Sequence, residues 1–217
     1  MAALLPRPAA ARFLVMLRAP ADRAISHLSM LTKLARRGEA WAQIYLYRNV
    51  SADTKLLAEA RAIGRCTASR GPKGAAPGHA PGHLSPKRWH ECVAVACGFH
   101  ACVVGQSIYE PQIRTWLNTF TARQVRVFTL DEFEVAPRAV LRRIESFLDL
   151  GPFPRLVLNW KWAWNAGKTK RRAGSVAPET LKALRRFYAP FNEALVTLLR
   201  KRGQPAAADA ASRWDRG

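Results

Sequence analysis

Hydrophobic residues recur along the chain with two periods, and each period predicts a different kind of element. Phe13–Leu17 is a short apolar run bounded by Arg12 and Arg18, which is typical of a buried strand. From Pro20 to Gly38, apolar residues recur every three or four positions, which predicts an amphipathic helix with a glycine at its C-terminal cap. The same two periods predict strands at 12–17 and 124–130, and helices at 20–37, at about 53–63, and from 110, 137 and 178.

Glycine and proline interrupt this pattern. Nine of them fall within residues 64–86, and we therefore expect an irregular insert at about 64–88. Pro190 lies inside the last helical pattern, where a proline is expected to break or kink the helix. The Ala-rich residues 202–217 are expected to form a flexible C-terminal tail, which leaves one domain over residues 1–201.

The order of the elements predicts the fold class. Strands that alternate with helices are typical of α/β proteins with a parallel sheet. We therefore expect strands 12–17 and 124–130 to share one sheet, with helix 20–37 packed on it. The sequence contains no apolar run of about 18 residues, the length that a transmembrane helix needs, so none is predicted.

The net charge points to anionic partners. The chain has 35 Lys and Arg residues against 15 Asp and Glu residues, which gives a formal net charge of +20. Such an excess favours nucleotides, sulfated or phosphorylated substrates, nucleic acid or membrane headgroups as partners. The chain is also rich in Ala, Pro and Gly, which indicates a genomic bias that contributes to the arginine content. Charge alone therefore does not select among these partners.

The cysteines leave two states open. Cys66, Cys92, Cys97 and Cys102 are too few for a disulfide scaffold in a chain of 217 residues. In a tetrahedral zinc site two cysteines are usually separated by two to four residues. Four residues separate Cys92 from Cys97 and Cys97 from Cys102, which is the wide limit of that range, and no closer pair occurs in the sequence. We expect no metal site, while buried thiols and disulfides are both compatible with this spacing.

An arginine and a serine flank the predicted turn from strand 12–17 to helix 20–37. Backbone N–H groups and the positive end of the helix dipole gather at such a junction, which favours a bound anion. Arg18 offers a planar fork to phosphate oxygens, and the Ser26 side chain leans toward the helix N-terminus. The spacing Arg-x-Pro-x-x-Arg-x-x-Ser after an apolar strand resembles the 3′-phosphate-binding motif of sulfotransferases. This resemblance implies that Arg18 and Ser26 hold the 3′-phosphate of 3′-phosphoadenosine 5′-phosphosulfate (PAPS).

Later segments extend the resemblance. Residues 105–117, 124–128 and 147–150 resemble the G-x-Y…W-L, Q-I-x-V and F-L-G-L runs of glycan-type sulfotransferases, and we expect their large apolar side chains to be core. Residues 167–172 resemble the G-K-S-K-G-R loop of heparan-type enzymes, with Arg171 in place of a glycine. The resemblance implies that four residues of this loop contact the nucleotide: Lys168, Thr169, Lys170 and Arg172.

The resemblance also implies a function. It implies a P-loop-like α/β sulfotransferase fold that transfers a sulfuryl group from PAPS to a hydroxyl or amine of a carbohydrate, in the Golgi. The family's K-x-G-T-T loop, which cradles the 5′-phosphosulfate, has no counterpart before Phe13. We therefore expect an N-terminally incomplete fold that binds the nucleotide weakly and transfers no measurable sulfate.

The catalytic base and two alternative functions stay open. The family uses a Glu or a His as the base, and the candidates here are His27, His90, His100 and Glu91, all of which are also ordinary surface or core residues. One alternative is a non-catalytic nucleic-acid-binding protein, favoured by the charge and by three tryptophans beside the basic loop. We do not expect nucleic acid as a partner, because the chain contains no known nucleic-acid-binding motif. The other alternative is a sulfotransferase-like pseudoenzyme.

Overall fold

The computed structural model describes residues 6–45, 50–68, 84–98, 102–158 and 176–215. It contains a parallel pair of strands, β1 (Phe13–Leu17) and β2 (Val125–Thr129), surrounded by helices. The register pairs Phe13 with Val125 and Leu17 with Thr129, so both strands end at the same edge of the sheet. The predicted strands and their common sheet are confirmed, and the arrangement is compatible with the expected α/β class.

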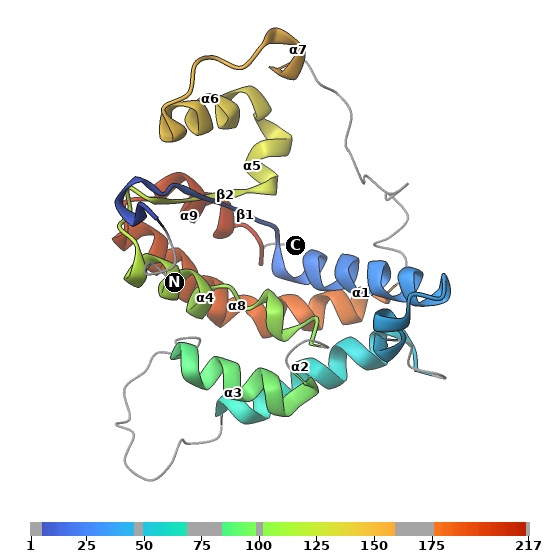
Figure 1. The fold of residues 1–217 in the computed structure, drawn as a ribbon. Coiled ribbons are helices and arrows are strands. Elements are labelled where there is room, and N and C mark those ends of the chain that lie inside the picture. The colour runs from blue at the N-terminus through green and yellow to red at the C-terminus, as the bar shows by residue number, and fades with distance from the viewer. Residues whose placement is uncertain (1–5, 46–49, 69–83, 99–101, 159–175, 216–217) are drawn as a thin grey trace, which may run out of the picture.

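The described residues are mostly helical (Figure 1). Proline occupies one of the first two positions in six of the longer helices, because its missing N–H and fixed φ suit the start of a helix. The helices are α1 (Pro20–Arg36), α2 (Ala52–Ala68), α3 (Pro86–Cys97), α4 (Glu110–Thr119), α5 (Leu130–Val135), α6 (Pro137–Leu148), α7 (Arg155–Leu158), α8 (Pro178–Lys201) and α9 (Pro205–Ala211), with short 3-10 turns η2 (Pro8–Ala10), η3 (Ala40–Tyr45) and η5 (Gly105–Ser107).

Buried side chains form two cores. The helical core combines α1, α2, α3, the residues on either side of η5 and the first part of α8. The sheet core combines β1, β2, α4, the second part of α8 and α9. The long helix α8 therefore contributes to both cores. In the view of Figure 1, α2 and α3 lie below α8, and the sheet and α9 lie above it. The expected core residues Ile113 and Leu117 of α4 are buried in the sheet core.

Two disulfides brace the helical core and settle the state of the cysteines. Cys66 near the end of α2 is bonded to Cys92 in α3, and Cys97 at the end of α3 is bonded to Cys102 just before η5. A Cβ atom on Gly105 would lie 2.6 Å from a Val93 methyl group and 2.9 Å from the Cys102 sulfur. η5 therefore packs against α3 at a distance that only a glycine permits.

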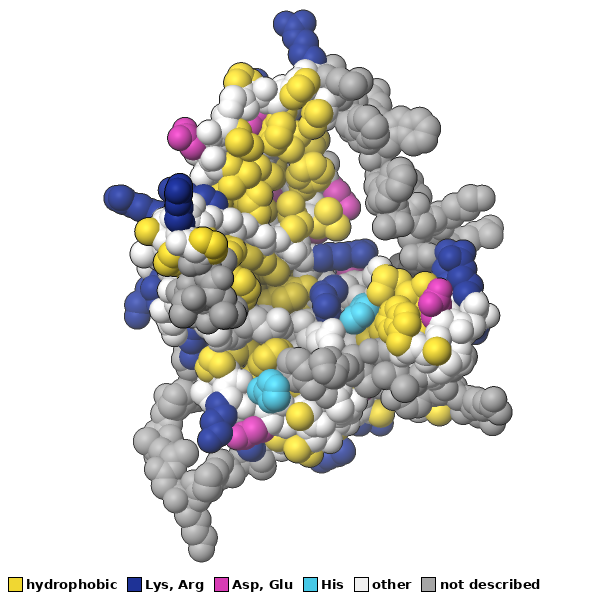
Figure 2. Space-filling view, viewed as in Figure 1, with side chains coloured by type: hydrophobic (Ala, Val, Ile, Leu, Met, Phe, Trp, Pro, Cys, Tyr) yellow, Lys and Arg dark blue, Asp and Glu magenta, His cyan; other side chains and the backbone are white. Residues whose placement is uncertain are grey.

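Helices α5 to α7 form a lobe above the sheet. The guanidinium of Arg143 lies 5.0 Å from the ring centroid of Phe128, and that of Arg126 lies 5.6 Å from the ring centroid of Phe147, so α6 packs against β2. Val140 is the buried residue of α6, while its other large apolar side chains are half-exposed. Figure 2 shows hydrophobic side chains at the surface over this lobe and beside the sheet.

The predicted packing of helix 20–37 on the sheet is wrong. The buried residues of α1, such as Leu28 and Leu31, belong to the helical core, where they meet α2 and α8. Figure 1 shows α1 leading away from the end of β1. The sheet is covered by α4, α8 and α9 on the side of the sheet core, so α1 packs against other helices.

The predicted break at Pro190 is also absent. α8 continues from Pro178 to Lys201 with this proline inside it. A proline removes one backbone hydrogen bond from a helix, but Tyr188 before it and Phe191 after it are both buried in the helical core. Packing on both sides of Pro190 therefore holds the helix together.

The expected insert is partly helical. α2 extends to Ala68 rather than ending near residue 63, and α3 begins at Pro86, where Ser85 caps it by accepting a hydrogen bond from the N–H of Arg88. The disulfide from α2 to α3 accounts for the extra order at these two ends. Residues 69–83, with most of the glycines and prolines, lie outside the described residues.

The predicted flexible tail is wrong for residues 202–215. They include α9, whose alanines pack in the sheet core together with Trp214. Small alanine side chains let α9 lie close to α8 and β2, and the indole N–H of Trp214 donates a hydrogen bond to Asp131. Every helix in the described part of the chain is too short or too polar to cross a membrane.

Candidate functional site

Arg18 lies where the two parallel strands end. It follows β1 directly, and α1 begins two residues later, so its side chain stands at the carboxyl edge of the sheet, where it is exposed. Ser26 is half-buried in the second turn of α1. The carboxyl edge of a parallel sheet is the usual position of ligand sites in α/β proteins. The structure therefore places these two predicted residues on either side of a helix N-terminus.

Two hydrogen bonds hold this turn against the segment before α4. The hydroxyl of Tyr109 donates to the carbonyl of Arg18 at 2.9 Å, and Arg23 donates to the hydroxyl of Ser107 at 3.0 Å. The Ser107 hydroxyl in turn donates to the carbonyl of Val103. From the sequence, the large apolar residues of 105–117 are expected only to form core. The structure shows that they also fix the backbone that carries Arg18.

Positive charge gathers at this turn. Burial raises the pKa of Tyr109 to about 12, although the nearby cations Arg23 and Arg18 act in the opposite direction. Tyr109 is therefore protonated at neutral pH and remains a hydrogen-bond donor. Among the described residues, the guanidinium of Arg18 makes no hydrogen bond or ion pair, so it is available to an anion. The carboxylate of Asp22, in the first turn of α1, is the opposing charge.

His27, next to Ser26, adds no positive charge at neutral pH. Burial, followed by the positive charge of Arg23, lowers its pKa from the ordinary value of 6.5. Its Nδ1 atom is buried and has no hydrogen-bond partner within the described ranges. The imidazole is therefore neutral at pH 7.

The hollow at the start of α1 is too small for a nucleotide. Its volume is about 20 Å³, close to that of one water molecule. Its wall includes the carboxylates Asp22 and Asp215 and the cation Arg185, so it does not favour an anion. A larger pocket lies farther along α1, but neither Arg18 nor Ser26 lines it. In the part of the chain that the structure describes, the predicted phosphate site is an open surface.

The other predicted residues are not brought to this surface by the described structure. Lys168, Thr169, Lys170 and Arg172 lie outside the described residues, as does His100. Their proximity to Arg18 stays a prediction.

Two further candidates for the catalytic base lie on α3. His90 and Glu91 are exposed there, and Glu91 forms an ion pair with Arg88. α3 packs against α2 and α4, and its residues belong to the helical core. The structure therefore gives neither residue a contact with Arg18 or Ser26.

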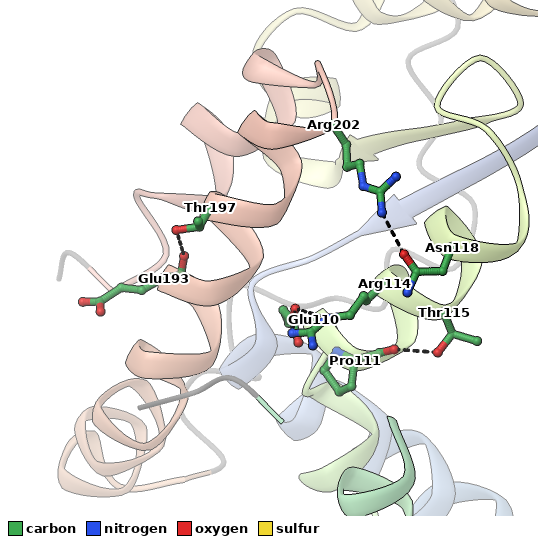
Figure 3. Close-up of polar contacts among 8 residues, drawn as sticks. All are labelled: Glu110, Pro111, Arg114, Thr115, Asn118, Glu193, Thr197 and Arg202. Atoms are coloured by element: carbon green, nitrogen blue, oxygen red, sulfur yellow. Dashed lines mark hydrogen bonds and ion pairs between the residues drawn. The ribbon is translucent and has the colours of Figure 1, made fainter. Parts of the chain in front are cut away.

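Two buried carboxylates were not predicted. Glu110 at the start of α4 is paired with Arg114 one turn later, and Figure 3 shows this pair beside the link from Arg202 at the end of α8 to Asn118 of α4. Burial raises the pKa of Glu110, and the Arg114 side chain acts in the opposite direction. The sequence signal for this pair is the i, i+4 spacing of an acid and an arginine. The Arg202–Asn118 hydrogen bond attaches the end of α8 to α4, while the Glu110–Arg114 pair lies within the first turns of α4 and has a role in the fold.

The second buried carboxylate is Glu59 of α2. It accepts a hydrogen bond from the N–H of Val104 at 2.9 Å and pairs with Lys55 at 3.2 Å. Burial raises its pKa. Cys97 and Cys102 lie near enough to Glu59 to complete a three-ligand metal group, but their sulfurs are bonded to each other and offer no thiolate.

Comparison with known proteins finds a distant similarity. No family model matches the chain. Over 111 residues, 49% of this chain and 18% of the relative, it is 29% identical to human carbohydrate sulfotransferase 15. Over 96 residues, 42% of this chain and 17% of the relative, it is 28% identical to the mouse protein of that name. The chain thus spans less than a fifth of the length of these relatives. The similarity indicates a sulfotransferase-like protein.

Proposed function

We propose that this chain carries the 3′-phosphate-binding part of a PAPS-dependent sulfotransferase with a P-loop-like α/β fold. In this proposal its acceptor is a hydroxyl or amine of a carbohydrate, and its location is the Golgi. The distant similarity to carbohydrate sulfotransferases supports the reaction class, and the resemblance of the motifs supports PAPS as the donor. The observation that carries the proposal is the position of Arg18 at the carboxyl edge of the sheet, with Ser26 in the helix that follows.

The residues at this edge fit a phosphate group. Arg18 provides a fork of N–H donors without a partner among the described residues, and the N-terminus of α1 provides a partial positive charge. Tyr109 and the Arg23–Ser107 bond hold the backbone of the turn in place, so binding requires little ordering of that backbone. Asp22 repels a phosphate dianion, which limits the affinity that this surface alone can give.

The reaction is an in-line transfer of the sulfuryl group. The bond from sulfur to the bridging oxygen of the 5′-phosphate breaks, a bond from sulfur to the acceptor oxygen or nitrogen forms, and the acceptor proton passes to a general base. The departing 3′-phosphoadenosine 5′-phosphate (PAP) keeps the bridging oxygen and gains its charge, which nearby cations stabilise. His27 is the one candidate base on the same helix as Ser26, and its lowered pKa leaves it able to accept a proton at pH 7.

Calorimetric titration with PAP tests the proposal. We expect Arg18→Ala to weaken binding about tenfold or more, because a charge-assisted contact to phosphate is lost. Ser26→Ala removes one neutral hydrogen bond and has a smaller effect. Arg142→Ala, which removes an exposed cation on α6, is the matched control and leaves binding unchanged. Binding should also weaken as salt concentration rises.

Two results would overturn the assignment. PAP binding that is equal in the wild type and in Arg18→Ala would remove the motif from the nucleotide site. Binding of a labelled oligonucleotide that is tighter than that of PAP, and insensitive to Arg18→Ala, would favour the nucleic-acid alternative.

A further inference from the structure

A pocket of about 420 Å³ lies between the second half of α1 and the start of α2. Four side chains that are almost completely buried form its floor: Ile25, Leu28, Leu56 and Val176. This volume lies in the range of pockets that hold small organic molecules. The pocket does not include Arg18 or Ser26, so it is separate from the proposed phosphate surface.

The character of the lining changes in order along α1. Apolar residues Ile25 and Leu28 come first, the hydroxyl residues Ser29 and Thr32 follow, and three cations complete the series at the end of the helix. These positions recur every three or four residues and therefore share one face of α1. A ligand that fits this sequence of surfaces has an apolar body at one end and a negative group at the other.

The cations at the polar end are Lys33, Arg36 and Arg37, and all three are exposed. Cations at a helix C-terminus stabilise the helix dipole, which accounts for positive charge at this place. The helix dipole does not explain why three cations surround one pocket. In the described part of the chain, none of the three has an acidic partner. Their combined charge is therefore available to an anion in the pocket.

A polar contact holds the far wall in position. Val176 precedes α8, and the next residue, Ala177, donates its backbone N–H to the Asp53 carboxylate of α2 at 2.8 Å. The hydrogen bonds from Thr180 and from Ala177 lower the pKa of Asp53, so this contact persists at neutral pH. The two walls of the pocket, α2 and the start of α8, are thus joined before any ligand binds.

We propose that this pocket binds an amphipathic organic anion, with a ring or short chain on the apolar floor and a sulfate, sulfonate, phosphate or carboxylate at Lys33, Arg36 and Arg37. The charged group is held by charge-assisted hydrogen bonds, and the body is held by removal of apolar surface from water. This proposal does not depend on the proposed function, because it uses other residues and a different part of α1.

A pair of dyes separates the two halves of the proposal. 1-Anilinonaphthalene-8-sulfonate carries a sulfonate on an aromatic body, and N-phenyl-1-naphthylamine has the same body without the charge. Fluorescence titration of the full chain should show tighter binding of the sulfonate. Reversing two rim charges, Lys33→Glu with Arg36→Glu, should weaken the sulfonate about tenfold or more and leave the neutral dye unchanged.

A matched control reverses two exposed cations elsewhere, Arg142→Glu with Lys201→Glu, which changes net charge equally. It should leave the affinity for the sulfonate within about twofold of the wild type, since distant exposed charges are screened. Ser29→Trp fills the pocket and should abolish binding of both dyes, with folding checked by circular dichroism. Equal weakening in the control and in the rim variant would overturn the proposal.

The place of binding is checked by chemical shifts. Adding the sulfonate should shift the backbone amides of Leu28, Leu56 and Val176. Shifts confined to α6, whose apolar face is half-exposed, would overturn the proposal. PAP should not displace the dye. Displacement that survives Arg18→Ala would place the nucleotide in this pocket and remove the separation of the two sites.

Discussion

The two cores of the molecule are stabilised in different ways, although α8 runs through both. The helical core has two disulfides. It also has two buried hydrogen bonds to the backbone of Val104: the Tyr188 hydroxyl donates to the carbonyl of Val104, and Glu59 accepts from the N–H of Val104. The sheet core consists mainly of apolar side chains, and the buried amide of Gln204 bonds to the backbone of β2 beside them. The helical core joins α2 and α3 across residues 69–83, so covalent links there restrict a long connection. The sheet core instead depends on the docking of α9.

The largest effects should come from a matched pair of truncations on α8. Leu184 and Leu199 are both 0% exposed, the first in the helical core and the second in the sheet core. Leu184→Ala and Leu199→Ala should each lower the free energy of unfolding by about 2–5 kcal/mol. Native-state hydrogen exchange should show the loss of protection in α2 for the first variant and in β2 for the second. Equal loss across both cores would show one cooperative unit.

The disulfides should differ in strength. The bond between Cys66 and Cys92 closes a span of 26 residues, and that between Cys97 and Cys102 a span of 5. Loop-closure entropy then predicts losses of about 3.5 and about 2 kcal/mol when each pair is replaced by serine. Urea unfolding of both double variants measures the losses. A larger loss for the shorter span would contradict this entropic account.

Gln204 should be the most sensitive polar residue of the sheet core. Its side-chain oxygen accepts from the N–H of Val127, and its amide donates to the carbonyl of Val125. Gln204→Leu leaves both backbone groups buried without these partners, so we expect a loss of about 1–3 kcal/mol in unfolding free energy. Gln43→Leu is the control, since Gln43 is exposed and donates one bond, to Ala35. Similar losses in both variants would show that burial of Gln204 is not decisive.

The smallest expected effect is the change in folding stability when His27 is protonated at low pH. The pKa of His27 in the folded chain lies below its ordinary value of 6.5, so the unfolded chain takes up a proton first as the pH falls. Stability from His27 is therefore complete above pH 6.5 and is lost as the pH falls through the lowered pKa. His27→Gln should flatten this part of the stability–pH curve, as measured by thermal unfolding at a series of pH values. A variant whose stability–pH curve has the slope of the wild type would contradict this account of His27.

The sequence predicted what local periodicity and capping determine. The turn from β1 to α1, with Arg18 and Ser26, follows from a short apolar run, a proline and a helical stripe. The hydrogen bond from the Tyr109 hydroxyl to the carbonyl of Arg18 could not be predicted, because these residues are 91 positions apart and no local pattern joins them. The pairing of Cys66 with Cys92, 26 positions away, depends on the same kind of distant contact.

α9 gave little sequence signal for a different reason. Alanines carry little hydrophobic weight, and residues 205–211 therefore resemble a polar tail. Their burial arises because small side chains allow close approach to α8 and β2. Pro190 does not break α8, since burial of Tyr188 and Phe191 outweighs the loss of one hydrogen bond.

The amide of Gln204 also sets the direction in which the sheet can grow. On the outer edge of β2 it occupies the backbone groups of Val125 and Val127 that another strand would use. The opposite edge, along β1, carries no strand among the described residues, and Leu14 and Met16 of β1 are 42% and 48% exposed. An additional strand therefore has one place to join. It would lie beside the strand that ends at Arg18, so the strand that extends the sheet would also form a wall beside the proposed phosphate surface.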